Sequence, residues 1–238
     1  MNEGALRRLL ENPPRLHSGD FGIRPSLLRF IVDHVKSDSL TLETGGGVST
    51  VCFAGISCEH TCIDPEIKVV ERIKDYCREN QISTDKVRFM IEGSQNVLPF
   101  LDFGGRRLDF ALIDGSHAFP VPVVDYYYIN ENLKVGGYIA VDDLFIRAVN
   151  ILHRFLITDP AYELVTIDQA KTGVYRKIAE TVYPENWVSQ DFNRPYPELS
   201  HLPLPRRVFQ KLISSFQLDI SPSAKRVYEI VRKMRGKL

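Results

Sequence analysis

Strand-like and helix-like segments alternate from residue 40 to residue 143, and this alternation restricts the possible fold more than any other feature. Strands joined by helices pair in parallel, because each helix carries the chain back across one face of the sheet. Two further segments, 162–167 and 172–178, are predicted to close the sheet as an antiparallel hairpin. The pattern therefore predicts a Rossmann-like, doubly wound α/β fold with a mostly parallel sheet of seven strands. The five strands expected before the hairpin cover residues 41–44, 60–64, 87–93, 108–115 and 136–143.

The composition divides the 238 residues into two regions. Residues 1–180 are predicted to form the α/β domain. This range includes an N-terminal helical segment, in which residues 26–35 have helical apolar spacing. Residues 181–238 are predicted to be a proline-rich segment and a basic C-terminal helix, 224–238, packed on that domain. The alternative for the basic helix is contact with a nucleic acid or a membrane surface.

Charge and cysteine content narrow the class of protein. Lys plus Arg and Asp plus Glu are 30 each, so no strong signal for nucleic acid is present. No apolar run is long enough for a transmembrane segment, and the N-terminus lacks the apolar core of a signal peptide. The four cysteines contain no CxxC pair and are expected to be reduced thiols. These features predict a cytoplasmic protein.

Three consecutive glycines, Gly45 to Gly47, separate the first predicted strand from the first predicted helix. In an open parallel sheet such a loop lies at the carboxyl edge, where ligands bind. Glycine permits positive φ and lets a ligand approach the backbone without a Cβ in the way. The following helix offers free N–H groups, with Ser49 or Thr50 able to cap it. The loop is therefore predicted to hold a nucleotide-like ligand.

The residues around the glycines distinguish between nucleotides. A nicotinamide or flavin fingerprint needs a third glycine or alanine where Thr50 stands, and a Walker loop needs a lysine that is absent. Glu43 precedes the loop, and its carboxylate suits an ammonium or sulfonium charge better than a pyrophosphate. Asp64 ends the second predicted strand, where an acid can bind both ribose hydroxyls. Together these residues favour S-adenosylmethionine.

Five motifs in this order resemble the class I S-adenosylmethionine-dependent methyltransferases, over about residues 25–178. They are ETGGGVST, CIDPE, EGSQNVLP, DFALIDGSHAF and LKVGGYIAVDD. The chain is most similar to the small-molecule O-methyltransferase-like branch with an IDGSH motif. Many members of the family carry an acid where Gly93 stands, so adenine recognition here is assigned to the backbone or Ser94. The cofactor-binding residues that the resemblance implies are Glu43, Thr44, Gly45, Gly46, Gly47, Ser49, Asp64, Gly93, Ser94 and Asp114.

Three carboxylates, Asp114, Asp142 and Asp143, follow the fourth and fifth predicted strands. If these strands are neighbours, the carboxylates repel one another, and a divalent ion would relieve the repulsion. The resemblance to catechol O-methyltransferase-like enzymes suggests that they bind Mg2+. The alternative is that Asp142 caps a helix beginning near Leu144, Asp143 is solvated, and Asp114 only touches substrate or cofactor.

His117 lies three residues beyond Asp114 in the loop IDGSHAF. An imidazole there could take the proton of a substrate hydroxyl, or it could fix the loop by a hydrogen bond. Asp114 and His117 are therefore the candidate catalytic residues.

The sequence thus predicts a methyltransferase that acts on an oxygen of a small or medium-sized acceptor. One alternative is methylation of a protein or nucleic acid, although an Asn-Pro-Pro-Tyr type motif for base amino groups is missing. Another is a non-catalytic protein that binds S-adenosylmethionine with the same fold. A homo-oligomer is compatible with the sequence, which does not identify the acceptor.

Overall fold

The computed structural model describes residues 3–17, 22–182 and 190–193. The chain forms two compact units, Met1–Tyr183 and Pro184–Leu238. The second unit contributes only the short 3-10 helix η3 (Asp191–Asn193) and Gln190 to the described residues. The predicted basic helix at 224–238 lies outside the described residues.

The first unit is built on a seven-stranded sheet with the order β3-β2-β1-β4-β5-β7-β6. The five strands from β3 to β5 run parallel, while β7 is antiparallel to both β5 and β6. This confirms the predicted doubly wound, mostly parallel sheet with a closing hairpin. The strands are β1 (Leu40–Thr44), β2 (Glu59–Ile63), β3 (Val87–Met90), β4 (Leu108–Ile113), β5 (Leu133–Val141), β6 (Tyr162–Asp168) and β7 (Thr172–Lys177).

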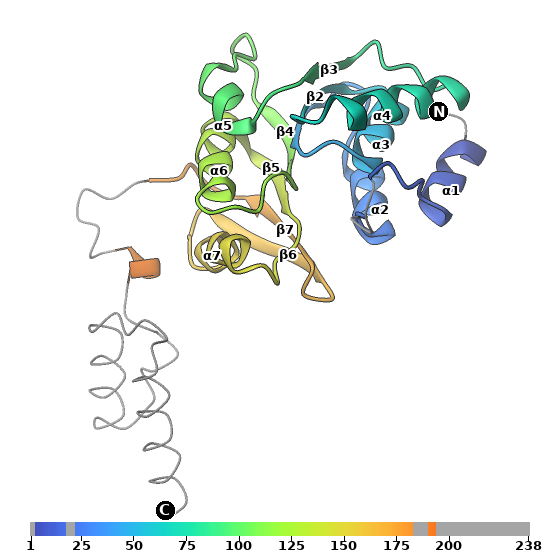
Figure 1. The fold of residues 1–238 in the computed structure, drawn as a ribbon. Helices are drawn as coiled ribbons and strands as arrows, with labels where there is room; N and C mark the ends of the chain where they lie inside the picture. The colour runs from blue at the N-terminus through green and yellow to red at the C-terminus, as the bar shows by residue number, and fades with distance from the viewer. Residues whose placement is uncertain (1–2, 18–21, 183–189, 194–238) are drawn as a thin grey trace, which may run out of the picture. The chain divides into compact units, whose positions relative to one another are not determined.

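Helices cover both faces of the sheet (Figure 1). One apolar core joins α1, α2, α3 and α4 to the sheet, and a second joins α5, α6 and α7 to its other face. The central strands carry apolar side chains on both faces, as expected of a sheet covered on both sides. The helices are α1 (Glu3–Glu11), α2 (Pro25–His34), α3 (Val48–Ile56), α4 (Ile67–Glu79), α5 (Ser94–Val97), the 3-10 helix η1 (Leu98–Phe100), α6 (Val121–Asn132) and α7 (Arg147–Leu156).

The strand order reverses between β1 and β4, and this reversal determines where a ligand can bind. From β1 the chain continues to β2 on one side, and β4 then pairs with β1 on its other side. Thr44 is in register with Ile63 and with Ile113, and Ile113 with Val141. The four strands therefore end at the same level, and the residues that follow them meet at one edge. This is the topological switch point, where open α/β sheets bind their ligands.

Two further observations concern the cysteines and the helices. All four cysteines are buried and free. Within the described residues, no helix is both long enough and apolar enough to cross a membrane.

Asp125 on α6 is a fully buried carboxyl group. Neither of its oxygens has a hydrogen-bond partner of good geometry among the described residues, although the hydroxyls of Ser94 and Thr44 lie beside it. Burial raises its pKa from 3.8 to about 6, and the two hydroxyls oppose the rise. The folded protein therefore holds the Asp125 proton more tightly than the unfolded chain does.

This proton makes stability depend on pH. Between about pH 4 and pH 6 the unfolded chain ionises Asp125 first, so we expect stability to fall as the pH rises through this window. The loss attributable to Asp125 should be roughly 2–3 kcal/mol. Urea unfolding of Asp125→Asn should show this as a growing advantage over the unmodified protein from pH 4 to pH 6.5. Asp85→Asn, at an exposed position, is the control. A pH-independent difference for Asp125→Asn would contradict the assignment.

Candidate functional site

The glycine loop between β1 and α3 packs directly against the end of β4. Gly45 has a φ of 84°, and a Cβ added there would overlap the carbonyl oxygen of Asp114 and lie 2.7 Å from its carbonyl carbon. A Cβ on Gly46 would lie 2.9 Å from the Cys62 sulfur. Both positions therefore require glycine for packing within the protein, as well as for the predicted approach of a ligand.

The start of α3 is fixed by Thr50, one of the two predicted capping residues. Its Oγ1 accepts a hydrogen bond from the Gly47 N–H at 2.9 Å and donates one to Glu43. Gly47 itself occupies the N-cap position. Ser49 is buried in the first turn of the helix and is not the cap.

Glu43 lies beneath the glycine loop in a buried polar network. Its Oε1 accepts the Thr50 hydrogen bond and is 3.1 Å from His60 Nε2. The other ring nitrogen of His60 is 2.8 Å from Thr41 Oγ1. Glu43 Oε2 is buried and has no hydrogen-bond partner among the described residues. Glu43 therefore supports the glycine loop through its hydrogen bond with Thr50, which in turn bonds to Gly47. Oε2 is the oxygen left for the predicted contact with a ligand.

Asp64 directly follows β2 and ties two loops together. Oδ2 accepts the Gly46 N–H at 2.8 Å, and Oδ1 accepts the Glu66 N–H at 2.7 Å. Burial raises the pKa of Asp64, although both N–H groups and nearby His17 favour the carboxylate. Each carboxylate oxygen can still accept a second hydrogen bond, so the predicted ribose contact is compatible with this geometry.

Replacing Asp64 tests that contact. If Asp64 binds the ribose, Asp64→Ala should weaken S-adenosylhomocysteine binding by roughly 1.5–3 kcal/mol, about tenfold to a hundredfold. Asp64→Asn retains one acceptor oxygen and should lose less. The measurement is isothermal titration calorimetry on protein whose fold is verified by circular dichroism. Unchanged affinity in a folded Asp64→Ala protein would remove Asp64 from the site.

His17 is a neighbour of the glycine loop that the sequence did not suggest. Its Nε2 is 2.8 Å from the Gly46 carbonyl oxygen and would lie 3.3 Å from a Cβ on Gly47. The segment that carries it is anchored by buried Leu16, whose carbonyl accepts a hydrogen bond from Arg72 at 2.8 Å. No motif marks this histidine, because its position depends on the path of the N-terminal segment across the domain.

The loop after β3 also carries predicted cofactor residues. Gly93 is half-buried, and its N–H donates to Glu92 Oε1 at 2.8 Å. Ser94 begins α5 and is buried, as is Thr44 at the end of β1. The acid of this loop, Glu92, thus stands one residue before Gly93 and accepts hydrogen bonds from the Gly93 N–H and the Asn96 side chain.

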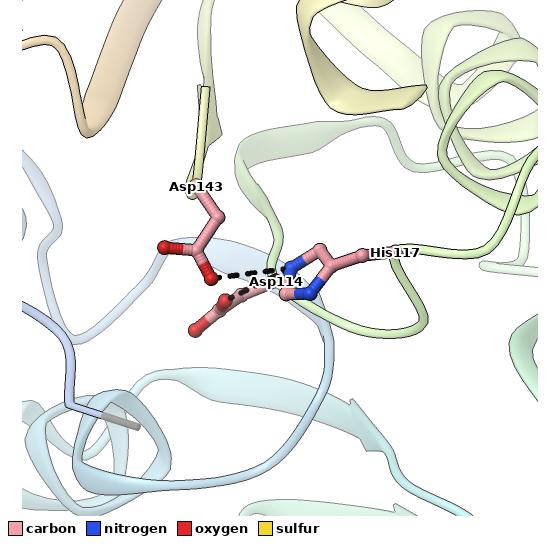
Figure 2. Close-up of side chains that lie close together, drawn as sticks. All are labelled: Asp114, His117 and Asp143. Atoms are coloured by element: carbon pink, nitrogen blue, oxygen red, sulfur yellow. Dashed lines mark ion pairs between the residues drawn. The ribbon is translucent and has the colours of Figure 1, made fainter. Parts of the chain in front are cut away.

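Asp114, His117 and Asp143 form a cluster beyond the ends of β4 and β5. Figure 2 shows the three side chains converging, with His117 Nε2 3.5 Å from Asp143 Oδ2 and 3.9 Å from Asp114 Oδ1. His117 Nε2 is buried yet forms no hydrogen bond of good geometry. Burial and the charges of Asp142 and Asp143 raise the pKa of Asp114 well above its usual value, against the opposing charge of Lys171.

Asp142, the third predicted metal ligand, is turned to other partners. It accepts hydrogen bonds from Lys171 and Thr172, and it is almost completely buried. It does not cap a helix either, because α7 begins at Arg147 and has Ile146 as its N-cap. Asp142 lies near Asp114, as expected from the order of the strands. Its carboxylate does not point to the same place as those of Asp114 and Asp143, so the predicted convergence of all three carboxylates is wrong. The group that could converge on an ion is Asp114, His117 and Asp143.

Lys171 is the second residue of the site that the sequence did not suggest. Its Nζ bonds to Asp142 and lies 3.0 Å from Asp143 Oδ1. Lys171 lies in the turn between β6 and β7 and reaches the cluster only because the hairpin pairs with β5. This contact between distant segments has no local signal in the sequence.

Comparisons with known proteins agree with this architecture. Residues 42–144 match the family described as a methyltransferase domain. A search of curated proteins finds no match.

Solved structures share the fold at low sequence identity. The O-methyltransferase TomG from Streptomyces achromogenes, in complex with SAM, has a TM-score of 0.59 and 15% identity over 75% of this chain and 92% of that chain. Cofactor-bound Rv0187 from MTB has a TM-score of 0.57 and 16% identity over 74% and 90%, respectively. An rRNA methylase from Streptococcus thermophilus has a TM-score of 0.50 and 14% identity over 65% and 95%.

One of these proteins is an O-methyltransferase and another an rRNA methylase, so the likeness concerns the shared sheet and its helices. The family match covers the glycine loop, Asp64 and the cluster after β4 and β5. Residues 42–144 thus match a methyltransferase domain, and the sheet and helices have the fold of solved methyltransferases.

Proposed function

We propose that this methyltransferase moves the methyl group of S-adenosylmethionine to an oxygen of a small or medium-sized molecule, with His117 as the base. The observation that carries the proposal is the buried Nε2 of His117, which has no hydrogen-bond partner among the described residues and lies beside two carboxylates that follow β4 and β5. A hydroxyl group placed there could donate its hydrogen to this nitrogen.

The glycine loop and Asp64 would hold the cofactor. Asp64 would accept hydrogen bonds from the ribose, and the loop after Gly45 would follow the methionine part closely. Thr44 and Ser94 lie at neighbouring loop ends, and Ser94 is the candidate for adenine. Asp114, beside Gly45, would lie between cofactor and acceptor. The cofactor supplies an electrophilic methyl group on a positively charged sulfur.

His117 and Asp143 would act on the acceptor. As the acceptor oxygen attacks the methyl carbon, the carbon–sulfur bond breaks and its electron pair leaves on sulfur, giving S-adenosylhomocysteine. The hydroxyl proton passes to His117 Nε2, and the carboxylates of Asp143 and Asp114 stabilise the imidazolium that forms. The remaining work of the protein is alignment of oxygen, carbon and sulfur.

The predicted Mg2+ site does not fit the donor set around this position. Asp142 is bonded to Lys171 and Thr172, and Asp143 is shared between Lys171 and His117. The remaining group contains an imidazole nitrogen, a ligand that Mg2+ disfavours. No step of the proposed reaction is routed through a metal.

A methyl-transfer assay tests the oxygen specificity. Tritium-labelled S-adenosylmethionine should label one or more members of a panel of phenols, hydroxy acids and other hydroxylated small molecules. Parallel reactions with ribosomal RNA and with protein extracts test the alternative acceptors. Labelling of RNA alone, or of amines but no hydroxylated compound, would overturn the assignment to a small oxygen acceptor.

A further inference from the structure

Lys171 is held at the cluster by its backbone as well as by its side chain. Its carbonyl accepts the N–H of Leu144, the residue after Asp143, at 2.8 Å. Its own N–H donates to the Asp168 carbonyl at 2.8 Å, which closes the turn from β6 to β7. The side chain is 19% exposed. The ammonium group is therefore fixed beside the strand end that carries Asp142 and Asp143.

The ammonium group occupies the space between two of the three carboxylates. Asp142 accepts from Lys171 with one oxygen and from Thr172 with the other. Asp143 faces Lys171 with Oδ1 at 3.0 Å and His117 with Oδ2 at 3.5 Å. Every oxygen of this pair thus faces a polar group of the protein, from Lys171, Thr172 or His117. Lys171 contacts one oxygen of Asp143 and His117 contacts the other, so Asp143 links Lys171 to the imidazole.

Charge balance explains why a cation belongs at this position. Three carboxylates close together in a mostly buried site repel one another and lose hydration. One positive charge between two of them offsets both effects. Burial alone would lower the pKa of Lys171, but its hydrogen bonds and the charges of Asp142 and Asp143 raise it, so the amine stays protonated. A divalent ion bound to Asp143 would meet this ammonium group at short range.

We propose that Lys171 is the resident cation of the transfer site: it takes the place of a divalent metal between Asp142 and Asp143 and, through Asp143, positions His117. Lys171 is a positioning residue in this account. The inference rests on the proposed function only for the role of His117. The charge compensation itself is a property of the folded protein and can be measured without an acceptor.

Metal binding gives a direct test. Mn2+ binding is followed by electron paramagnetic resonance on the full chain, with Mg2+ competition to identify a hard oxygen site. The unmodified protein should show no stoichiometric Mn2+ site at sub-millimolar ion. Lys171→Met and Lys171→Gln remove the charge and leave the carboxylates, so each should gain a site at least roughly tenfold tighter. Lys171→Arg keeps the charge and should not gain one.

Two controls distinguish the gain of a Mn2+ site at the cluster from general effects of charge and folding. Lys134→Met removes an ammonium from an ion pair with Asp109 at another part of the sheet and should not create a Mn2+ site. Lys171→Met combined with Asp143→Asn should lose the gained site. A stoichiometric Mn2+ or Mg2+ site in the unmodified protein would overturn the proposal. This measurement uses the unmodified protein, so it does not depend on whether a variant folds. Folded Lys171→Met and Lys171→Gln proteins without a gained site would overturn it as well.

A catalytic readout links the cation to His117. Methyl transfer by the unmodified protein should be unaffected by a chelator, and Lys171→Met should lower kcat while leaving the affinity for S-adenosylhomocysteine unchanged. A chelator that abolishes activity would contradict the proposal. If no acceptor is methylated at all, the proposed function fails while the Mn2+ result still decides the role of Lys171.

Discussion

Replacing His117 with alanine should lower kcat for methyl transfer by roughly a hundred- to ten-thousandfold, the usual contribution of a general base. The reason is that Nε2 is buried and has no hydrogen-bond partner among the described residues, whereas the Asp143 carboxylate beside it also contacts Lys171. The affinity for S-adenosylhomocysteine should stay within about twofold, because the cofactor is assigned to the glycine loop and Asp64. Initial rates at saturating cofactor measure the effect.

A control and a rescue experiment make this result specific. His34→Gln changes an exposed histidine of α2 that bonds to the Phe30 carbonyl, and it should leave kcat unchanged. Added imidazole should restore part of the activity of His117→Ala if the lost group moves a proton. A His117→Ala enzyme with full activity would mean that the loop histidine only fixes the loop, the alternative considered from the sequence.

Replacing Gly45 with alanine should produce the largest loss of stability among the substitutions considered. The added Cβ would overlap the backbone carbonyl of Asp114, lying 2.7 Å from its carbon and 3.0 Å from Gly115 Cα. These are backbone atoms of a central strand end and cannot turn aside as a flexible side chain can. With the cost of the positive φ, we expect a loss of about 4 kcal/mol or more, together with loss of S-adenosylhomocysteine binding.

Gly104 provides a matched comparison for Gly45. It also has a positive φ, 62°, but a Cβ there would meet no atom within 4 Å. Gly104→Ala should therefore cost only about 1 kcal/mol, from the backbone conformation alone. Urea unfolding of both variants separates the steric part from the conformational part. Equal losses for the two variants would show that the approach to Asp114 does not restrict residue 45.

The order of strands and helices could be predicted because each element is indicated by a pattern within its own short stretch of sequence. The apolar segment of β4 and the amphipathic pattern of α4 each lie within a short stretch of chain, and the glycines mark the turn between β1 and α3. Boundaries were less accurate where the signal was weak: β3 ends at Met90, three residues before the predicted end, and β5 begins at Leu133, three residues before the predicted start. A short edge strand and a strand that follows a helix directly offer few residues to mark their ends.

The site was predictable only as far as strand ends determine it. Asp114 and Asp143 were expected near one another because β4 and β5 were expected to be neighbours, and the register places them so. Lys171 and His17 could not be predicted, since each reaches the site from a segment far away in the chain. The direction of Asp142 depends on Lys171 and Thr172, so it could not be read from the motif either.

Glu43 has contacts within the protein that its motif does not indicate. The motif predicts that this acid faces the ligand, and in the buried carboxylate one oxygen, Oε1, contacts Thr50 and His60, which leaves Oε2 for the predicted contact. The polar residues on α3 and β2 that hold it become neighbours only when the helix packs on the sheet. The sequence indicated the charge, and tertiary packing determined its direction.

The identity of the cofactor is the claim on which the rest of the account depends, and calorimetry tests it most directly. The unmodified protein should bind S-adenosylhomocysteine with one site per chain and a dissociation constant in the micromolar range, and it should not bind NAD under the same conditions. Binding of NAD without binding of S-adenosylhomocysteine would contradict the account of this site.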